Sequence, residues 1–94
     1  MLFANKIKVL RESKQILQRH ISAALDMDNA MYCKIERGDR RAKKEQVSII
    51  AKLLQINEKQ LLILWLADKI IEAIGNEREF ANESFNIVQK YIEK

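Results

Sequence analysis

The stretch from residue 16 to residue 38 reads Ile-Leu-Gln-Arg-His-Ile-Ser-Ala-Ala-Leu-Asp-Met-Asp-Asn-Ala-Met-Tyr-Cys-Lys-Ile-Glu-Arg-Gly, and it decides the fold. Its apolar spacing predicts a helix over about residues 18–25. Asp28 is a good N-cap for a second helix over residues 29–37. Gly38 follows, where a left-handed residue commonly ends a helix. The stretch therefore predicts two short helices joined by a tight turn.

Apolar residues recur at helical spacing on both sides of this stretch. Further helices are predicted over about residues 5–14, 44–54, 57–74 and 76–93. Asn57 with Gln60 and Asn76 with Glu79 resemble capping boxes at the start of the last two. The chain has no proline and only two glycines, and no turn signal typical of a β-hairpin. We therefore expect an all-α fold.

Composition limits the class of protein. The 94 residues suit one domain, and the apolar content of 48% with 32% charged residues is not typical of disordered or membrane chains. The longest apolar run, over residues 61–67, is too short to span a bilayer, and the charged N-terminal region does not resemble a signal peptide. One cysteine, Cys33, cannot form an internal disulfide, which fits a reducing compartment. We expect a cytoplasmic protein.

Charge is unevenly distributed along the chain. Residues 1–44 contain eleven Lys or Arg and five Asp or Glu, a net charge of +6, whereas residues 45–94 contain six and eight, a net charge of −2. A basic half beside a mildly acidic half favours a polyanionic partner such as nucleic acid. The alternative is an ordinary solvated surface.

No pattern in the chain predicts catalysis. His20 is the only histidine and has no partners at metal-ligand spacing, and a zinc site is not supported because Cys33 is alone. The alternative for Cys33 is a redox-sensitive thiol beside DNA. There is no glycine-rich phosphate loop. We expect neither an enzyme nor a cofactor or metal site.

The predicted helix over residues 29–37 carries short or flexible side chains on its outer side, where a helix in the major groove of DNA reads base edges. The candidate base-reading residues are Asn29, Ala30, Met31, Cys33 and Lys34. Asparagine can pair with adenine, lysine with guanine, and apolar side chains with thymine methyl groups. Alternatives stay open: Asn29 as a solvated residue, Met31 as a buried space-filler and Lys34 as a phosphate contact.

Four short patterns together resemble the lambda-repressor-like helix-turn-helix family, also called the Cro/repressor or XRE class. They are Ile-Lys-x-Leu-Arg at residues 7–11, Gln-x-x-Ile-x-x-x-Leu at 18–25, Tyr-x-Lys-Ile-Glu-Arg-Gly at 32–38 and Val-x-x-Ile-Ala-x-x-Leu at 47–54. The resemblance covers residues 7–62 without a gap. It implies a five-helix bundle that binds double-stranded DNA as a dimer.

The resemblance also implies roles for individual residues. Asn29, Ala30 and Lys34 occupy base-reading positions, and Gln18 occupies a phosphate-contacting position. Arg11 and Glu36 correspond to a partly buried ion pair with a structural role. Our full set of candidate phosphate-binding residues is Gln18, Arg19, Asp28, Arg37, Arg40, Arg41, Lys43 and Lys44.

Some positions depart from the family pattern. Asp26 replaces a turn glycine, Gln15 stands where glycine often ends the first helix, and Lys43 replaces a Ser or Thr cap. Asp tolerates a left-handed backbone better than most residues. Asp28 would repel phosphate unless its carboxylate is engaged in capping.

The predicted helix over residues 57–74 is apolar around much of its circumference. We expect residues 1–62 to form the DNA-binding core and residues 63–94 to form a helical extension within one domain. The last helix is expected to pack on part of the preceding one, and a second subunit to cover the remainder. The candidate dimerisation residues are Leu62, Trp65, Leu66, Ile70, Phe85 and Val88. Alternatively, the terminal hairpin completes a monomeric core.

Two functions from different classes follow. The first is a transcriptional regulator that binds a partly palindromic operator as a homodimer, with the helix over residues 29–37 in the major groove. The second is an antitoxin or adaptor that uses the same fold and its apolar C-terminal helices to bind a partner protein.

Overall fold

The computed structural model describes residues 1–94 and contains only helices and the turns between them. The helices are α1 (Leu2–Ser13), α2 (Gln18–Ala24), α3 (Asn29–Arg37), α4 (Lys44–Leu54), α5 (Glu58–Ile74) and α6 (Ala81–Ile92), with a 3-10 helix, η1 (Arg78–Phe80), before α6. The all-α prediction is confirmed, and the predicted bounds of α3 and α4 match the structure. No helix combines the length and the apolar character needed to cross a bilayer.

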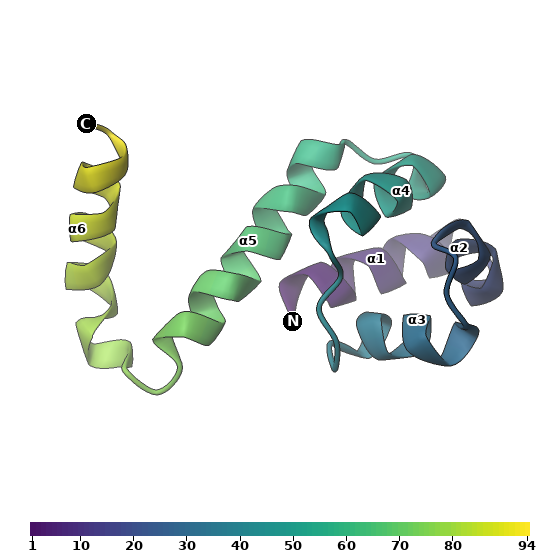
Figure 1. Cartoon of the computed structure of the whole chain (residues 1–94), viewed down its shortest axis with the longest axis horizontal. Helices are drawn as coiled ribbons and strands as arrows, with labels where there is room; N and C mark the ends of the chain where they lie inside the picture. The colour runs from purple at the N-terminus through teal and green to yellow at the C-terminus, as the bar shows by residue number, and fades with distance from the viewer.

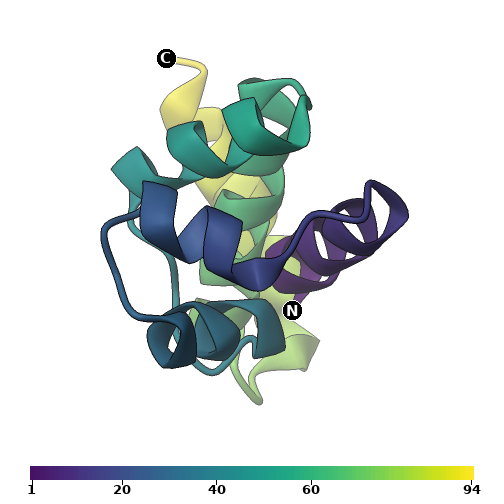
Figure 2. The ribbon, with the colours of Figure 1, turned by 90° about the vertical axis from the view of Figure 1, so that its right-hand side faces the viewer.

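One apolar core holds α1 to α4 against the first half of α5 (Figure 1, Figure 2). Each of these five helices contributes side chains at the positions that the apolar spacing indicates. The buried cluster comprises Phe3, Ile7, Ile21, Leu25, Tyr32, Ile35, Ala42, Val47, Ile50, Ala51, Leu54 and Leu61. Burial of one such large side chain stabilises the fold by about 1.5–3 kcal/mol, so the core fixes how α2 and α3 lie on the bundle.

Helix α1 begins at Leu2, earlier than the predicted start at residue 5, because a side chain of α5 caps it. The carboxylate of Asp68 accepts hydrogen bonds from the backbone N–H groups of Leu2 and Phe3, at 2.9 and 3.0 Å. The first N–H groups of a helix have no partner within the helix and lie at the positive end of its dipole. Asp68, which is only 4% exposed, supplies both the acceptors and the opposite charge.

Left-handed residues end several of the helices. Gln15, Asp26 and Gln55 have φ values of 56°, 56° and 55°. Gln15 and Asp26, which depart from the glycines expected from the resemblance, therefore both adopt the left-handed conformation. Gly38 has a φ of 83°, and a Cβ atom there would lie 2.7 Å from Cγ of Met1. The left-handed backbone therefore favours glycine at this position, and a larger residue would also displace the Met1 side chain.

The C-terminal end of α5 and the whole of α6 extend away from the core (Figure 1). No residue of α6 is buried. The radius of gyration is 15.1 Å, whereas a compact chain of this length has one of about 12 Å. The expectation that the last helix packs on the apolar side of the fifth is wrong, and so is the alternative of a completed monomeric core.

The connection between α5 and α6 explains this difference. Gly75 ends α5 with a positive φ, and the chain continues as η1 before α6 begins at Ala81. Neither η1 nor α6 has a capping hydrogen bond from a side chain, so the predicted capping box of Asn76 and Glu79 is not formed. The chain therefore leaves α5 in a wide turn instead of folding back along it.

Candidate nucleic-acid interface

The outer edge of α3 consists of the candidate base-reading residues Asn29, Ala30, Met31, Cys33 and Lys34. Asn29, Ala30 and Lys34 are exposed, and Met31 and Cys33 are partly exposed. The opposite side of α3 faces the core, where the side chains of Tyr32 and Ile35 are buried. The first turn of α3 is therefore presented to solvent on a rigid support, as the pattern predicts.

Asp28 caps the first turn of this helix. Its carboxylate Oδ1 accepts a hydrogen bond from the backbone N–H of Met31 at 2.7 Å, and its backbone is extended. A carboxylate at this position also interacts favourably with the helix dipole. Asp28 was included in the phosphate-binding set, and the structure shows its side chain engaged within the protein.

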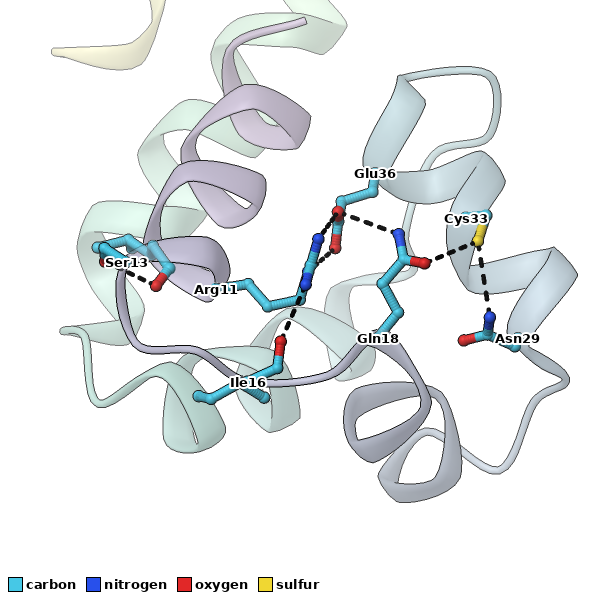
Figure 3. Close-up of polar contacts among 8 residues, drawn as sticks. Arg11, Ser13, Ile16, Gln18, Asn29, Cys33 and Glu36 are labelled. Atoms are coloured by element: carbon cyan, nitrogen blue, oxygen red, sulfur yellow. Dashed lines mark hydrogen bonds and ion pairs between the residues drawn. The ribbon is translucent and has the colours of Figure 1, made fainter.

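A chain of hydrogen bonds joins the interior to the outer edge of α3 (Figure 3). Arg11 Nε donates to Glu36 Oε2 at 2.8 Å, and Arg11 Nη2 donates to Glu36 Oε1 at 2.9 Å. Gln18 Nε2 donates to the same Oε1 at 3.2 Å, and the Cys33 thiol donates to Gln18 Oε1 at 3.2 Å. A longer contact of 3.9 Å links Asn29 Nδ2 to Cys33 Sγ. Three helices are thus connected by polar side chains.

The ion pair at the inner end of this chain is nearly enclosed. The side chain of Glu36 is 2% exposed and that of Arg11 is 13% exposed. Burial acts to raise the pKa of Glu36, but the hydrogen bonds from Arg11 and Gln18 outweigh burial and hold that pKa below its usual value. The hydrogen bond to Glu36 raises the pKa of Arg11. Both groups are therefore charged at neutral pH, and the structural role predicted for the pair agrees with this geometry.

Tyr32 lies beside this ion pair. Its side chain is fully buried, and its hydroxyl has no hydrogen-bond partner of ordinary geometry. Burial, followed by the proximity of the Glu36 carboxylate, raises the pKa of Tyr32. The ring fills the core beneath α3 and anchors this helix on the bundle.

Gln18 is less available than predicted. Its amide nitrogen and amide oxygen are both engaged, with Glu36 and with Cys33. A Gln18 contact to phosphate through the side chain needs a rearrangement of these bonds. The sequence did not indicate this engagement, because the three residues belong to two helices whose relative placement depends on the core.

Cations flank the outer edge of α3 on both sides. On one side, Arg19 lines a shallow hollow of about 340 Å³ together with Leu17, Gln18 and Asn29. On the other side, a hollow of about 190 Å³ includes Met31, Arg40, Arg41 and Lys43 among its lining residues. The fold therefore brings predicted phosphate-binding residues from separate parts of the chain to the two borders of the predicted base-reading residues.

Two of these cations have carboxylate partners. Arg37 Nε lies 3.1 Å from Asp39 Oδ2, and Arg41 pairs with Glu72 of α5. The other candidates, Arg19, Arg40, Lys43 and Lys44, are exposed. No local sequence pattern predicts the pair of Arg41 and Glu72, because only the packing of α5 brings the two residues together.

Helix α5 also holds the connection between α3 and α4. The indole N–H of Trp65 donates to the backbone carbonyl of Ala42 at 2.7 Å, and Ala42 is 2% exposed. The ammonium of Lys69 lies 4.2 Å from the centre of the Trp65 ring. This part of α5 fixes the cationic connection over residues 39–43 in place.

The predicted dimerisation residues fall into two groups. Leu62 and Trp65 are partly buried against the core. The other four, Leu66, Ile70, Phe85 and Val88, are 43–53% exposed and lie on the parts of α5 and α6 that extend from the core. Only the second group is available to a partner over most of its surface.

In comparisons with known proteins, no family model, no curated protein and no solved structure matches this chain.

Proposed function

We propose that this protein is a sequence-specific DNA-binding transcriptional regulator in which α2 and α3 act as a helix-turn-helix of the lambda-repressor-like class. The observation that carries the proposal is the outer edge of α3, where Asn29, Ala30 and Lys34 are exposed. Arg19 borders this edge on one side, and three cations, Arg40, Arg41 and Lys43, border it on the other. A helix supported in this way can enter the major groove while cations beside it contact the two flanking backbones.

In this proposal, the outer edge of α3 reads bases. The amide of Asn29 can pair with N6 and N7 of adenine, and the ammonium of Lys34 can donate to O6 and N7 of guanine. The methyl group of Ala30 is suited to a thymine methyl group. Cys33 and Met31 lie deeper, and they are more suited to packing against a base edge than to pairing with it.

The flanking cations supply affinity. Arg19 lies on one border, and Arg40 and Lys43 lie on the other. Lys44, exposed at the start of α4, follows Lys43, and all four are free to bind phosphates. Arg41 is only partly exposed, at 31%, and its partner Glu72 is 67% exposed. Exposed ion pairs of this kind contribute about 0–1 kcal/mol, so a phosphate can displace the carboxylate at little cost.

We further propose that the regulator binds as a homodimer to a partly palindromic operator. Each α3 then enters one half-site, and the half-sites lie about 34 Å apart, one turn of the DNA helix. The exposed apolar side chains of α5 and α6 support the dimer, because a monomer gains nothing from presenting them to water.

The test is selection of preferred duplexes from a random pool, followed by fluorescence anisotropy at several salt concentrations. If about four phosphates are neutralised by each subunit, log K falls with log salt at a slope of roughly −7. Lys59→Ala, which removes one positive charge from the first turn of α5, is the control variant and leaves the salt slope unchanged. Absence of salt-sensitive binding to any duplex at low ionic strength would contradict the proposal.

A second candidate is a protein-interaction module of the antitoxin or adaptor type. The observation that favours it is α6, which has no buried residue and yet carries a strongly apolar side. The anisotropy experiment separates the two candidates, because an interaction module without DNA binding gives no salt-dependent signal.

A further inference from the structure

An apolar groove runs between the C-terminal half of α5 and the whole length of α6. Its volume is about 640 Å³. Ile70 and Ile74 line the α5 wall, and the α6 wall is formed mainly by one row of apolar side chains. The two helices run in opposite directions and meet only at the end closed by η1. The groove is therefore open along its length.

The apolar surface of the C-terminal part of the chain, within the groove and outside it, is large for a chain of this size. Ten large apolar residues between Ile63 and Ile92 are 43–76% exposed. At roughly 150–250 Å² for a large side chain, with about half of each one exposed, the ten together present on the order of 1,000 Å². A stable interface buries about 800 Å² on each partner, whereas the largest apolar patch on an ordinary monomer covers about 300–600 Å². The ten residues together expose the area that one side of a stable dimer needs. Half of them, Ile70, Phe80, Phe85, Val88 and Ile92, line the groove itself.

The apolar row of α6 has the spacing of a helix that pairs with another helix. Its members are Ala81, Phe85, Val88 and Ile92, separated by four, three and four residues. This is the spacing of the a and d positions in a heptad repeat. All four line the groove.

The same row is complementary to itself when two copies run antiparallel. With the two-fold axis between residues 86 and 87, Phe85 of one copy lies opposite Val88 of the other, and Ala81 lies opposite Ile92. Each pair combines a larger side chain with a smaller one, which is the arrangement that fills space between facing helices. The row therefore fits a second α6 without alteration.

The four positions that flank this row within α6 are uncharged, and the charged residues that line the groove, Glu77 and Glu93, lie before and after α6 in the chain. Asn82, Ser84, Gln89 and Tyr91 occupy the flanking positions, whereas Glu83 and Lys90 lie on the side of α6 away from the row. Flanking charges commonly select a partner of opposite charge, and neutral flanks impose no repulsion between identical helices. This composition favours a second copy of the chain over a charged peptide.

We propose that the groove is occupied by α6 of a second copy, inserted antiparallel to the first, with each copy filling the groove of the other. The two α6 helices then lie at the centre of a four-helix arrangement, with one α5 on each outer side. This inference deepens the proposed function, on which it rests for its biological purpose, by naming the surface that pairs two DNA-binding units. Its physical test does not involve DNA.

Analytical ultracentrifugation of the full chain tests the pairing. The wild-type chain sediments at twice its mass of 11.0 kDa at micromolar concentration. Val88→Glu sediments as a monomer, with an unchanged helical circular dichroism spectrum because Val88 is 53% exposed and supports no core contact. Val9→Glu is the matched control, since Val9 is 54% exposed on α1 outside the groove, and it remains a dimer. A monomeric wild-type chain, or a dimeric Val88→Glu variant, would overturn the proposal.

Disulfide cross-linking tests the antiparallel register. Two single-cysteine variants are made in a Cys33→Ser background, one with A81C and the other with I92C. Oxidation of an equimolar mixture gives covalent dimers that contain one chain of each kind, whereas each variant alone cross-links slowly. Faster cross-linking of A81C to itself than to I92C would overturn the register.

The two proposals fail in distinguishable ways. A monomer that still binds duplexes in a salt-dependent manner overturns the pairing and leaves DNA binding intact. A dimer that binds no duplex supports the pairing and overturns the regulator function.

Discussion

Arg11 and Glu36 form a two-pronged ion pair that joins α1 to the last turn of α3, with N–O distances of 2.8 and 2.9 Å. Arg11 also donates through Nη1 to the carbonyl oxygen of Ile16 at 2.9 Å, which ties the same guanidinium to the turn before α2. One side chain thus fixes the relative positions of three helices. Glu36 also accepts a hydrogen bond from Gln18, whose amide oxygen accepts one from Cys33 (Figure 3). The geometry of the outer edge of α3 therefore depends on the Arg11–Glu36 pair.

Removal of the guanidinium should destabilise the fold strongly. Arg11→Met keeps the apolar stem and leaves the Glu36 carboxylate buried without a cation, so the free energy of unfolding falls by about 3 kcal/mol. Urea unfolding followed by circular dichroism measures the change. Lys8→Met, an exposed position on the same helix, is the control and stays within about 0.5 kcal/mol of wild type. A similar small change for Arg11→Met would show that the pair contributes little.

The ion pair also predicts a dependence of stability on pH. The pKa of Glu36 in the folded protein lies below its usual value, so at mildly acidic pH the unfolded chain binds a proton at this position that the folded protein does not. Its contribution is complete above about pH 5 and is lost as pH falls from about pH 4.3 through the folded pKa. Arg11 stays protonated throughout and adds no slope.

Urea unfolding of wild type and Glu36→Gln from about pH 3 to about pH 7 isolates this contribution. The difference in unfolding free energy between the two proteins is largest near neutral pH and narrows below about pH 4.3. Other carboxylates cancel in the comparison. A difference that is constant over the whole range would contradict the prediction.

The Asp28 cap of α3 should contribute measurably to the free energy of unfolding. Asp28→Ala removes the acceptor for the backbone N–H of Met31, so the free energy of unfolding falls by about 1 kcal/mol. Asp28→Ser restores an acceptor and recovers most of the loss. Thermal unfolding of the three proteins checks the prediction. Equal stability of the alanine and serine variants would show that the cap is not the cause.

The left-handed residue after α1 offers a stabilising change. Gln15 has a φ of 56°, a conformation that costs a residue with a Cβ atom roughly 1 kcal/mol and costs glycine little. Gln15→Gly should therefore raise the free energy of unfolding by about 0.5 kcal/mol, after the greater flexibility of the unfolded chain is subtracted. Lys8→Gly, within α1, is the control and lowers stability by about 0.5–1 kcal/mol. Loss of stability in Gln15→Gly would refute the argument.

The proposed division between base-reading and phosphate-binding residues predicts two kinds of defect. Asn29→Ala and Lys34→Ala each weaken binding to the selected duplex by about 1–3 kcal/mol and relax the preference at one base pair. Arg40→Ala, an exposed cation at the border of α3, weakens all duplexes alike and reduces the salt slope by about one for each subunit. Selection experiments with each variant measure both effects. A changed base preference in Arg40→Ala would contradict the division.

The part of the fold that sequence alone predicted is the part governed by local chemistry. Asp28 caps α3 and Gly38 ends it in the expected left-handed conformation, because both effects act within a few residues. Asp26 and Gln15 adopt the backbone conformation that glycine serves in the resembled family. The exposed position of Asn29 and Lys34 follows from the helical spacing of Tyr32 and Ile35.

The candidate site was predicted as a set of residues but not as a set of contacts. The engagement of Gln18 with Glu36 and Cys33, and the pairing of Arg41 with Glu72, join side chains that are distant in sequence. No local pattern encodes such pairs, since their energies depend on distances that only the packed core sets. The sequence predicted a set of cations for the borders of α3 but could not show which ones are paired within the protein.

The sequence by itself determined which segments become helices, where their ends lie and which side of each helix is apolar, because these properties arise from spacing, caps and backbone preference within a few residues. Tertiary structure alone decided that Asp68 caps α1, that Arg41 meets Glu72 and that α6 stands apart from α5 with its apolar side uncovered. The physical reason is that an apolar helix face makes burial favourable but does not specify which surface covers it. The surface that provides the burial is chosen by the geometry of the whole chain.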